Sequence, residues 1–318
     1  MSARRTLRDL RRGAVVGVLV LAACSSPTAE SEGPASEPSP SSTELFDIDD
    51  GDPLPFPGYA VDRVTIAPLP PRPDATEAPT LTGWAAFDAS LEQAVLGGGS
   101  DAVSVAVSID GEIVHEAAMG VRLPDTVEAV ESTDKFRIAS ISKTITAITA
   151  LQLVEEGVIG LDDPIGSIVA DAVGVGEPSA GVAGLTLRQL LTHTSGFPQY
   201  ENLFFRNQVG SCEEAAAVGA TRSLQGAGYR YSNMNYCVLG LVIEQLTGQG
   251  YEQVVYDRLL TPLGISGMRL APTQDPGPGE AVHRSVPDRN YMEVLGAAGA
   301  WVASPADLVA ILDSLDPD

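Results

Sequence analysis

The sequence predicts an α+β fold, in which the strands come first along the chain and the helices follow. Residues 103–109 alternate apolar with small or polar side chains, and an Asp110-Gly111 turn leads to a second strand from Glu112. This pattern is typical of a β-hairpin. Beyond residue 140 the apolar residues instead recur at helical spacing. We therefore expect an antiparallel sheet flanked by helices, together with a mostly helical subdomain.

The length and composition describe a globular protein with a sizeable core. The chain has 318 residues, 44% of them hydrophobic, which is enough for one large domain or two smaller ones. Its formal net charge is −23. Such an acidic protein repels phosphate backbones, so we expect no nucleic-acid partner.

The N-terminus has the pattern of a targeting segment. An arginine-rich stretch precedes an apolar run from Gly13 to Ala23, which is too short to span a bilayer. The run ends in Leu-Ala-Ala-Cys-Ser-Ser, which resembles the lipobox of a bacterial lipoprotein. Residues 1–23 are therefore predicted to be a lipoprotein signal peptide, with Cys24 lipidated and holding the protein at the outer side of the cell membrane. The alternative is a plain secretory signal with an incidental cysteine.

Residues 24–80 are predicted to form a tether. They are rich in proline, serine and glutamate, and such a composition buries too little apolar area to fold. The folded domain is expected to cover residues 81–318.

Within that domain several helices are expected from apolar spacing and from their end signals. The first runs from Trp84 to Leu96 and stops at three glycines, and the hairpin follows it. A polar loop at residues 128–134 then leads to a buried helix at residues 141–154. Further helices are expected at residues 186–192, 235–246 and 251–260.

Ser140 and Lys143 stand at the start of the buried helix. Residues three apart share a helix face, so the amine of Lys143 can reach the hydroxyl of Ser140 and activate it as a nucleophile. Burial lowers the pKa of a lysine, which allows it to act as a base near neutral pH. The same spacing occurs at Ser132 and Lys135, but no apolar helix follows that pair. A helix-capping serine beside an unrelated lysine is the structural alternative.

Tyr231 and Asn233 follow some ninety residues later, in a turn just before a helix. The phenol can transfer a proton, and the carboxamide can hold a substrate amide. On their own these residues would be read as a turn with capping side chains.

Together these motifs resemble the penicillin-recognising serine hydrolases, the family of class C β-lactamases, D-alanyl-D-alanine carboxypeptidases and related esterases. The resemblance covers about residues 81–314. Its motifs are Phe-Arg-Ile-Ala-Ser-Ile-Ser-Lys at 136–143, Leu-Asp-Asp-Pro-Ile at 161–165, Leu-Leu-Thr-His-Thr-Ser-Gly at 190–196, Tyr-Ser-Asn at 231–233, Leu-Gly at 239–240, Pro-Leu-Gly at 262–264 and the glycine-containing turn before a helix at 298–308.

The resemblance implies a role for each residue. Ser140 would be the acylated nucleophile, with Lys143 and Tyr231 sharing the proton transfers. Asn233 would bind the substrate amide or carbonyl, and the Ser140 backbone N–H would supply half of an oxyanion hole. No cofactor is implied. The expected reaction is hydrolysis of a peptide, amide, ester or β-lactam carbonyl, most plausibly on cell-wall peptides that end in D-Ala-D-Ala.

One motif of the family is missing. We find no Lys- or His-Thr/Ser-Gly after Asn233, and the family would still need about three strands and a final helix after residue 318. The domain is therefore expected to be C-terminally incomplete or to be a degenerate relative. A non-catalytic envelope lipoprotein that keeps the fold as a binding module is the alternative function.

Two other kinds of active site lack their motifs in this sequence. No G-x-S-x-G elbow of a Ser-His-Asp hydrolase is present, and the three histidines (His115, His193 and His283) lack metal-ligand spacing. His193 is expected to be a structural group at a helix end. Cys212 and Cys237 are expected to form a disulfide outside the cytoplasm, the alternative being two separate buried thiols.

Overall fold

The computed structural model describes residues 16–24, 83–124, 126–226, 228–283 and 285–315. It has two small antiparallel sheets, one with the strand order β1-β2-β3 and one with the order β4-β6-β5. The strands are β1 (Val16–Cys24), β2 (Ser100–Ile109), β3 (Glu112–Gly120), β4 (Phe136–Arg137), β5 (Arg269–Leu270) and β6 (Trp301–Ala303).

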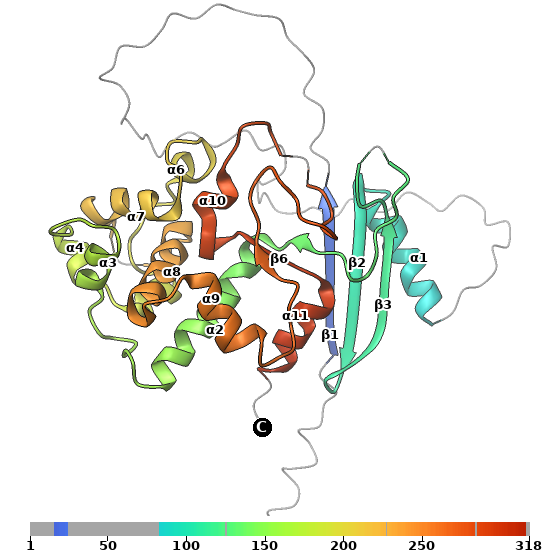
Figure 1. The fold of residues 1–318 in the computed structure, drawn as a ribbon, viewed down its shortest axis with the longest axis horizontal. Helices are drawn as coiled ribbons and strands as arrows, with labels where there is room; N and C mark the ends of the chain where they lie inside the picture. Colours follow the sequence, from blue (N-terminus) through green and yellow to red (C-terminus); the bar gives the residue numbers. More distant parts are fainter. Residues whose placement is uncertain (1–15, 25–82, 125, 227, 284, 316–318) are drawn as a thin grey trace, which may run out of the picture.

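Helices make up most of the remainder, and all of them except α1 lie to one side of the β2–β3 hairpin (Figure 1). They are α1 (Trp84–Val95), α2 (Ser142–Glu155), α3 (Gly166–Ala172), α4 (Ala180–Ala183), α5 (Leu187–Leu191), α6 (Glu201–Phe205), α7 (Cys212–Thr221), α8 (Asn233–Thr247), α9 (Tyr251–Val255), α10 (Tyr291–Leu295) and α11 (Pro305–Asp313). Three helical turns join them, namely η1 (Ala139–Ile141), the π-helical η2 (Tyr256–Leu260) and η3 (Gly296–Ala298). The predicted α+β class is confirmed.

The predicted hairpin is present, and its first strand, β2, is buried. β2 pairs antiparallel with β3 around the Asp110-Gly111 turn, where both residues have positive φ. Residues 102–107 of β2 are buried whichever way they point, because both α1 and α11 pack on the sheet. Ser108 Oγ donates to Asp313 Oδ1 on α11 at 3.1 Å.

The other edge of β2 is occupied by β1. This strand pairs antiparallel with β2 from Val16 opposite Ile109 to Cys24 opposite Ser100. It comes from the segment that the sequence predicts to be the apolar part of a signal peptide. The signal peptide and the lipidation of Cys24 stay predictions, and the predicted tether lies almost entirely outside the described residues.

α8 is the central helix of the helical part. α2, α3, α5, α7, α9 and η3 all contact it, and nine of its fifteen residues are buried. Its sequence is apolar around most of its circumference, as a helix covered on all sides requires. Gly248 ends it with a left-handed φ of 70°, which glycine adopts without steric cost.

The predicted helix boundaries differ from the structure by a few residues. The helix expected at 235–246 begins two residues earlier, at Asn233, because Ser232 caps it. The helix expected at 251–260 divides into α9 and η2. No helix in the described part of the chain is both long enough and apolar enough to cross a membrane.

Candidate active site

Ser140 lies in η1, the 3-10 turn that leads directly into α2. The sequence places it in the first turn of the helix itself, so the structure shifts it slightly toward the N-terminus. The preceding residue, Ala139, has a φ of 45°, which is unfavourable for a residue with a Cβ atom. Such strained backbone concentrates at functional sites. The Ser140 side chain remains exposed to solvent.

Lys143 is buried one turn farther along, on α2, with only 6% of its surface exposed. Its Nζ donates to Asn233 Oδ1 at 2.8 Å and to the Ala298 carbonyl at 2.7 Å, and lies 3.2 Å from Ser140 Oγ. None of the ion pairs among the described residues includes this lysine. Burial without a counter-charge lowers the pKa of Lys143 from 10.5 to about 7.

The hydrogen bonds of Lys143 fit its neutral form. A neutral amine has two hydrogens and one lone pair. When Asn233 Oδ1 and the Ala298 carbonyl accept the two hydrogens, the lone pair is left for the hydroxyl hydrogen of Ser140. Near pH 7, the pKa of Lys143, about half of the molecules therefore have a neutral amine that can act as a base toward Ser140.

Tyr231 completes the contacts of the serine. Its hydroxyl lies 2.6 Å from Ser140 Oγ, and its ring lies 4.9 Å from Lys143 Nζ. Burial raises the pKa of Tyr231, although its hydrogen bond with Ser140 acts in the opposite direction. The phenol is therefore protonated at neutral pH and can donate a proton.

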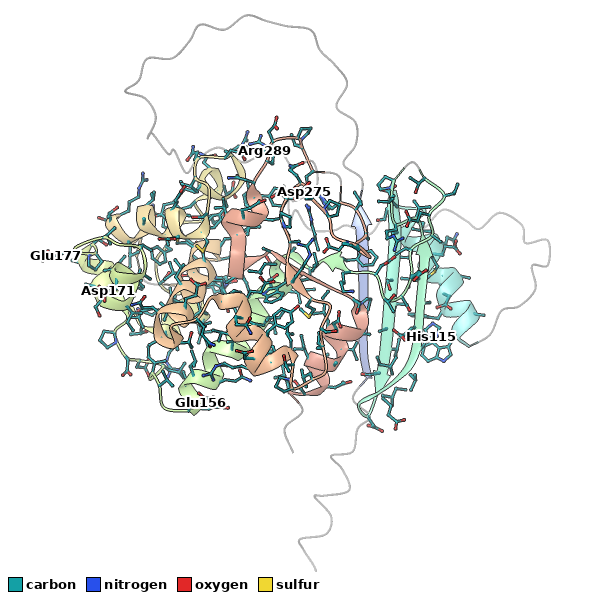
Figure 2. The ribbon with its side chains drawn as sticks, in the orientation of Figure 1. His115, Glu156, Asp171, Glu177, Asp275 and Arg289 are labelled. Carbon is teal, nitrogen blue, oxygen red and sulfur yellow. A yellow bond between two sulfur atoms is a disulfide. The ribbon has the colours of Figure 1, made fainter. Side chains whose placement is uncertain are left out.

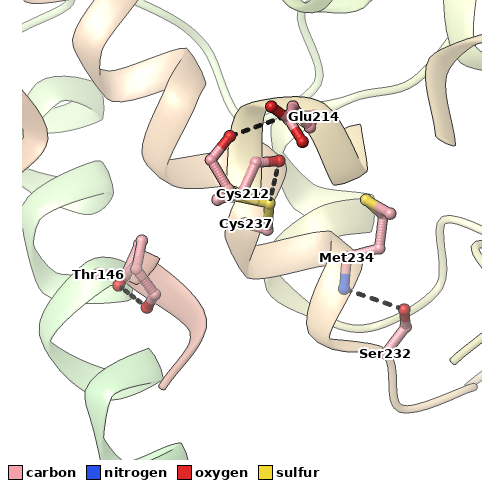
Figure 3. The surroundings of a disulfide bond; sticks show 8 residues. Thr146, Cys212, Glu214, Ser232, Met234 and Cys237 are labelled. Carbon is pink, nitrogen blue, oxygen red and sulfur yellow. Dashed lines mark hydrogen bonds between the residues drawn. A yellow bond between two sulfur atoms is a disulfide. The ribbon is translucent and has the colours of Figure 1, made fainter. Parts of the chain in front are cut away.

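Ser232 explains why the Tyr-Ser-Asn turn begins a helix. Its hydroxyl accepts the Met234 N–H at 3.2 Å as the N-cap of α8 (Figure 3). The same hydroxyl donates to the Pro198 carbonyl at 2.6 Å. The extended backbone of Ser232 separates Tyr231 from Asn233, the first residue of α8. Both side chains consequently reach Lys143, and Tyr231 reaches Ser140 as well.

The Ala298 carbonyl was not predicted, because a backbone carbonyl leaves no residue-type signal. It lies in η3, which packs directly on α8. The approach is close because Gly240 of α8 has no side chain, and a Cβ there would lie 2.5 Å from Ala297 Cβ. Thr146 of α2 also bonds this turn, donating to the Ala297 carbonyl at 2.7 Å.

A disulfide joins Cys212 of α7 to Cys237 of α8, with the Cα atoms 5.6 Å apart (Figure 3). The structure thus pairs the two cysteines that the sequence predicts to be bonded. α7 itself was not predicted. Its signal was Ser211 followed by Glu214, since Ser211 caps the helix by accepting the Glu214 N–H.

Two of the rival groups, Lys135 and His115, lie apart from this arrangement, whereas His193 does not. Lys135 Nζ donates to the carbonyl of Thr133 at 3.4 Å rather than to Ser132. His115 lies on the hairpin side of the molecule (Figure 2), where its Nε2 bonds Asp88 at 2.7 Å. His193 does follow the end of α5, and it is also buried beside Tyr231.

Comparison with known proteins points to one family. The model of the β-lactamase family matches residues 87–318. A penicillin-binding protein 4 of Amycolatopsis lactamdurans is 31% identical over 179 residues, which are 54% of this chain and 45% of that protein. A penicillin-binding protein of Bacillus subtilis is 27% identical over 169 residues, 50% of this chain and 36% of its own. The chain thus spans less than half the length of these two relatives.

A solved structure gives the same likeness. It is that of the D-amino acid amidase from Ochrobactrum anthropi in complex with L-phenylalanine amide. The TM-score is 0.56 at 26% identity, and the match covers 70% of this chain and 67% of the amidase.

Proposed function

The chain belongs to the β-lactamase family, and from that membership we propose that it is a serine hydrolase that forms an acyl-enzyme at Ser140. The observation that carries the proposal is the buried amine of Lys143, which lies within hydrogen-bond distance of the Ser140 hydroxyl and has two other acceptors for its hydrogens. A capping serine beside an unrelated lysine would not need this arrangement.

The reaction follows from these contacts. Lys143 takes the proton of Ser140 as Oγ attacks the substrate carbonyl carbon. Tyr231 gives its phenolic proton to the leaving nitrogen or oxygen as that bond breaks, and regains a proton from the lysine ammonium. A water molecule then attacks the acyl ester, and its proton passes to the same groups. The lowered pKa of Lys143 and the raised pKa of Tyr231 favour this division of base and acid.

Asn233 and the backbone of Ser140 would hold the substrate. Because the Oδ1 atom of Asn233 accepts from Lys143, its amide hydrogens are directed away from the lysine and suit a substrate carbonyl oxygen. The Ser140 N–H is the proposed oxyanion donor, and one such donor is worth about 10²–10³ in rate.

The proposed substrate class is an amide or a β-lactam, most plausibly a cell-wall peptide that ends in D-Ala-D-Ala. The two penicillin-binding relatives and the amidase support this class. The predicted lipoprotein signal would place the protein at the cell envelope, where such peptides occur. An ester is the other substrate that an acyl-enzyme site of this kind could hydrolyse.

Labelling of Ser140 tests the proposal. A fluorescent penicillin or an activated-serine phosphonate should label the protein, and Ser140→Ala should abolish the label. Ser132→Ala is the matched control because it removes the serine of the rival pair, and it should label like the wild type. Label that persists in Ser140→Ala would refute the assignment.

The same experiment separates an enzyme from a binding module. A binding module would remain unlabelled while the folded protein still bound the D-Ala-D-Ala peptide. An enzyme should be labelled and should also release the terminal D-alanine over repeated turnovers.

A further inference from the structure

His193 lies between two segments that form the candidate site. One residue separates it from the end of α5. It has a left-handed φ of 55° and is 8% exposed. Its ring centroid lies 4.6 Å from that of Tyr231 and 5.2 Å from that of Tyr236. The imidazole therefore supports the face of the tyrosine whose hydroxyl contacts Ser140.

Hydrogen bonds that His193 accepts hold both neighbours of Tyr231. The Arg230 N–H donates to the His193 carbonyl at 2.8 Å. On the other side, the Ser232 N–H donates to His193 Nδ1 at 3.2 Å. Tyr231 is thus fixed at both of its flanking backbone positions by one residue from a distant segment.

These contacts determine where the imidazole carries its proton. A backbone N–H can only donate, so Nδ1 must accept from Ser232. Asn235 agrees with this assignment. Phe197 N–H donates to Ser195 Oγ, whose own hydrogen goes to Asn235 Oδ1, which leaves the Asn235 amide hydrogens to face His193 Nδ1 at 2.9 Å. The neutral ring therefore carries its hydrogen on Nε2.

We propose that His193 is a positioning residue, whose neutral Nε2-protonated imidazole holds the Tyr231 hydroxyl over Ser140. The inference rests on the proposed acyl-enzyme chemistry and deepens it. His193 touches no reacting atom. Its loss should slow acylation because the Tyr231 turn is released, not because a base is removed.

Acid should release the same turn. A hydrogen on Nδ1 would point at the two groups that donate to it, so protonation and the bonds to Nδ1 exclude each other. The titratable groups that face the ring are Lys143 from α2, Tyr229 and Tyr231 from the segment before α8, and Tyr236 from α8. Phenols are neutral in acid. Burial, and then the charge of Lys143, lower the pKa of His193 below its usual 6.5.

The tautomer gives a test that needs no activity. Long-range ¹⁵N–¹H correlation spectra of the labelled full chain should show the His193 ring as the Nε2–H tautomer at neutral pH. The chain has three histidines. The imidazole signal that disappears in His193→Gln is therefore that of His193. An Nδ1–H tautomer, or a midpoint above 6.5, would overturn the inference even if the protein hydrolysed its substrate well.

The pH dependence of acylation gives the second test. If acylation depended on the deprotonation of Lys143 alone, the logarithm of its rate would rise with pH at a slope of about one. In the wild type we expect a slope that approaches about two below the His193 midpoint, because His193 must then lose a proton as well. His193→Gln should keep a slope of about one throughout. His115→Gln is the matched control and should behave like the wild type.

The size of the loss in acylation rate distinguishes the contribution of the hydrogen-bond acceptor Nδ1 from that of the aromatic ring. His193→Phe keeps an aromatic ring but has no acceptor, so acylation should slow by about tenfold or more, the equivalent of one lost hydrogen bond. His193→Gln can still accept and should recover part of the loss. A wild type that is acylated with a slope of about one on both sides of the His193 midpoint measured in the spectra would overturn the positioning role. Absence of any acylation would instead count against the proposed function.

Discussion

Lys143 owes its low pKa to burial, which its three neutral neighbours do not offset. Asn233, Ala298 and Ser140 offer it oxygens but no negative charge, so burial dominates. A carboxylate in any of these places would stabilise the ammonium form and remove the base. The neutral side chain of Asn233 therefore helps to keep the pKa of Lys143 low, because an aspartate of the same size would raise it.

The depressed pKa of Lys143 also predicts how stability changes with pH. Between its folded pKa of about 7 and its unfolded value of 10.5, the unfolded chain holds a proton that the folded chain lacks, so stability rises with pH. Relative to Lys143→Met, the wild type should gain about 2 kcal/mol of unfolding free energy from pH 7 to pH 9. Urea unfolding of both proteins at several pH values measures this difference.

Lys135→Met, which replaces the chain's other lysine, is the control for that series. A difference between wild type and Lys143→Met that stayed constant or fell with rising pH would contradict a low pKa at Lys143.

Individual residues of the site were predictable where their type carries the chemistry. Ser140 and Lys143 differ from Ser132 and Lys135 in that an apolar helix follows them. In the structure this helix carries Lys143 and packs against α8 and η3, which leaves the lysine buried. The Ala298 carbonyl could not be predicted, since any residue supplies a carbonyl. His193 was expected to be a helix-end group, and its contacts with Tyr231 depend on a chain reversal that local sequence does not encode.

At the scale of elements, α2 and α8 position the site together. α2 carries Lys143, while α8 begins at Asn233. η3 packs against both helices and supplies the remaining acceptor of the lysine. The distance between α8 and η3 is thus as important to the site as the side chains themselves.

Gly240 sets that distance and can be tested without touching the site. In Gly240→Ala the new Cβ would overlap Ala297, so η3 must move and the Ala298 carbonyl should leave Lys143. We expect a loss of about 1–3 kcal/mol in stability from overpacking and slower acylation of Ser140. Calorimetry and labelling rates measure the two effects.

Gly184→Ala is the matched control, because a Cβ at that exposed position would meet nothing within 4 Å. Its stability should stay within about 0.5 kcal/mol of the wild type. Normal labelling in Gly240→Ala would show that the lysine tolerates movement of η3.

Long elements were easier to predict than short ones. α2 and α8 have apolar periodicity over fourteen and fifteen residues, enough to distinguish a helix from a strand. α6 and α10 have five residues each and are held by tertiary packing, since helices this short are not stable alone. Their formation depends on what covers them and not on their own sequence.

At the scale of the whole molecule, charge and targeting signals predict where the protein works. The acidic composition predicts no nucleic-acid partner on electrostatic grounds, and the disulfide between α7 and α8 suits an oxidising compartment. The disulfide agrees with export of the domain from the cytoplasm, which the arginine-rich start and the apolar run predict.

Lipidation of Cys24 is the testable part of that prediction. Cells expressing the full chain with an alkyne fatty acid should yield a labelled protein in the membrane fraction, and Cys24→Ala should lose both the label and the membrane association. Cys212→Ser, which removes a disulfide cysteine, should keep the label. A labelled Cys24→Ala protein would place the lipid elsewhere or exclude this anchor.

The pairing of β1 with β2 has a consequence for processing. β1 covers the backbone of the long, apolar strand β2 along nearly its whole length. Cleavage before Cys24 would remove eight of its nine residues and leave the N–H and C=O groups of β2 without their partner strand. An uncovered edge of this kind recruits strands from other chains and leads to aggregation. We therefore expect a processed form to cover this edge of β2 with another segment, which would link maturation to solubility.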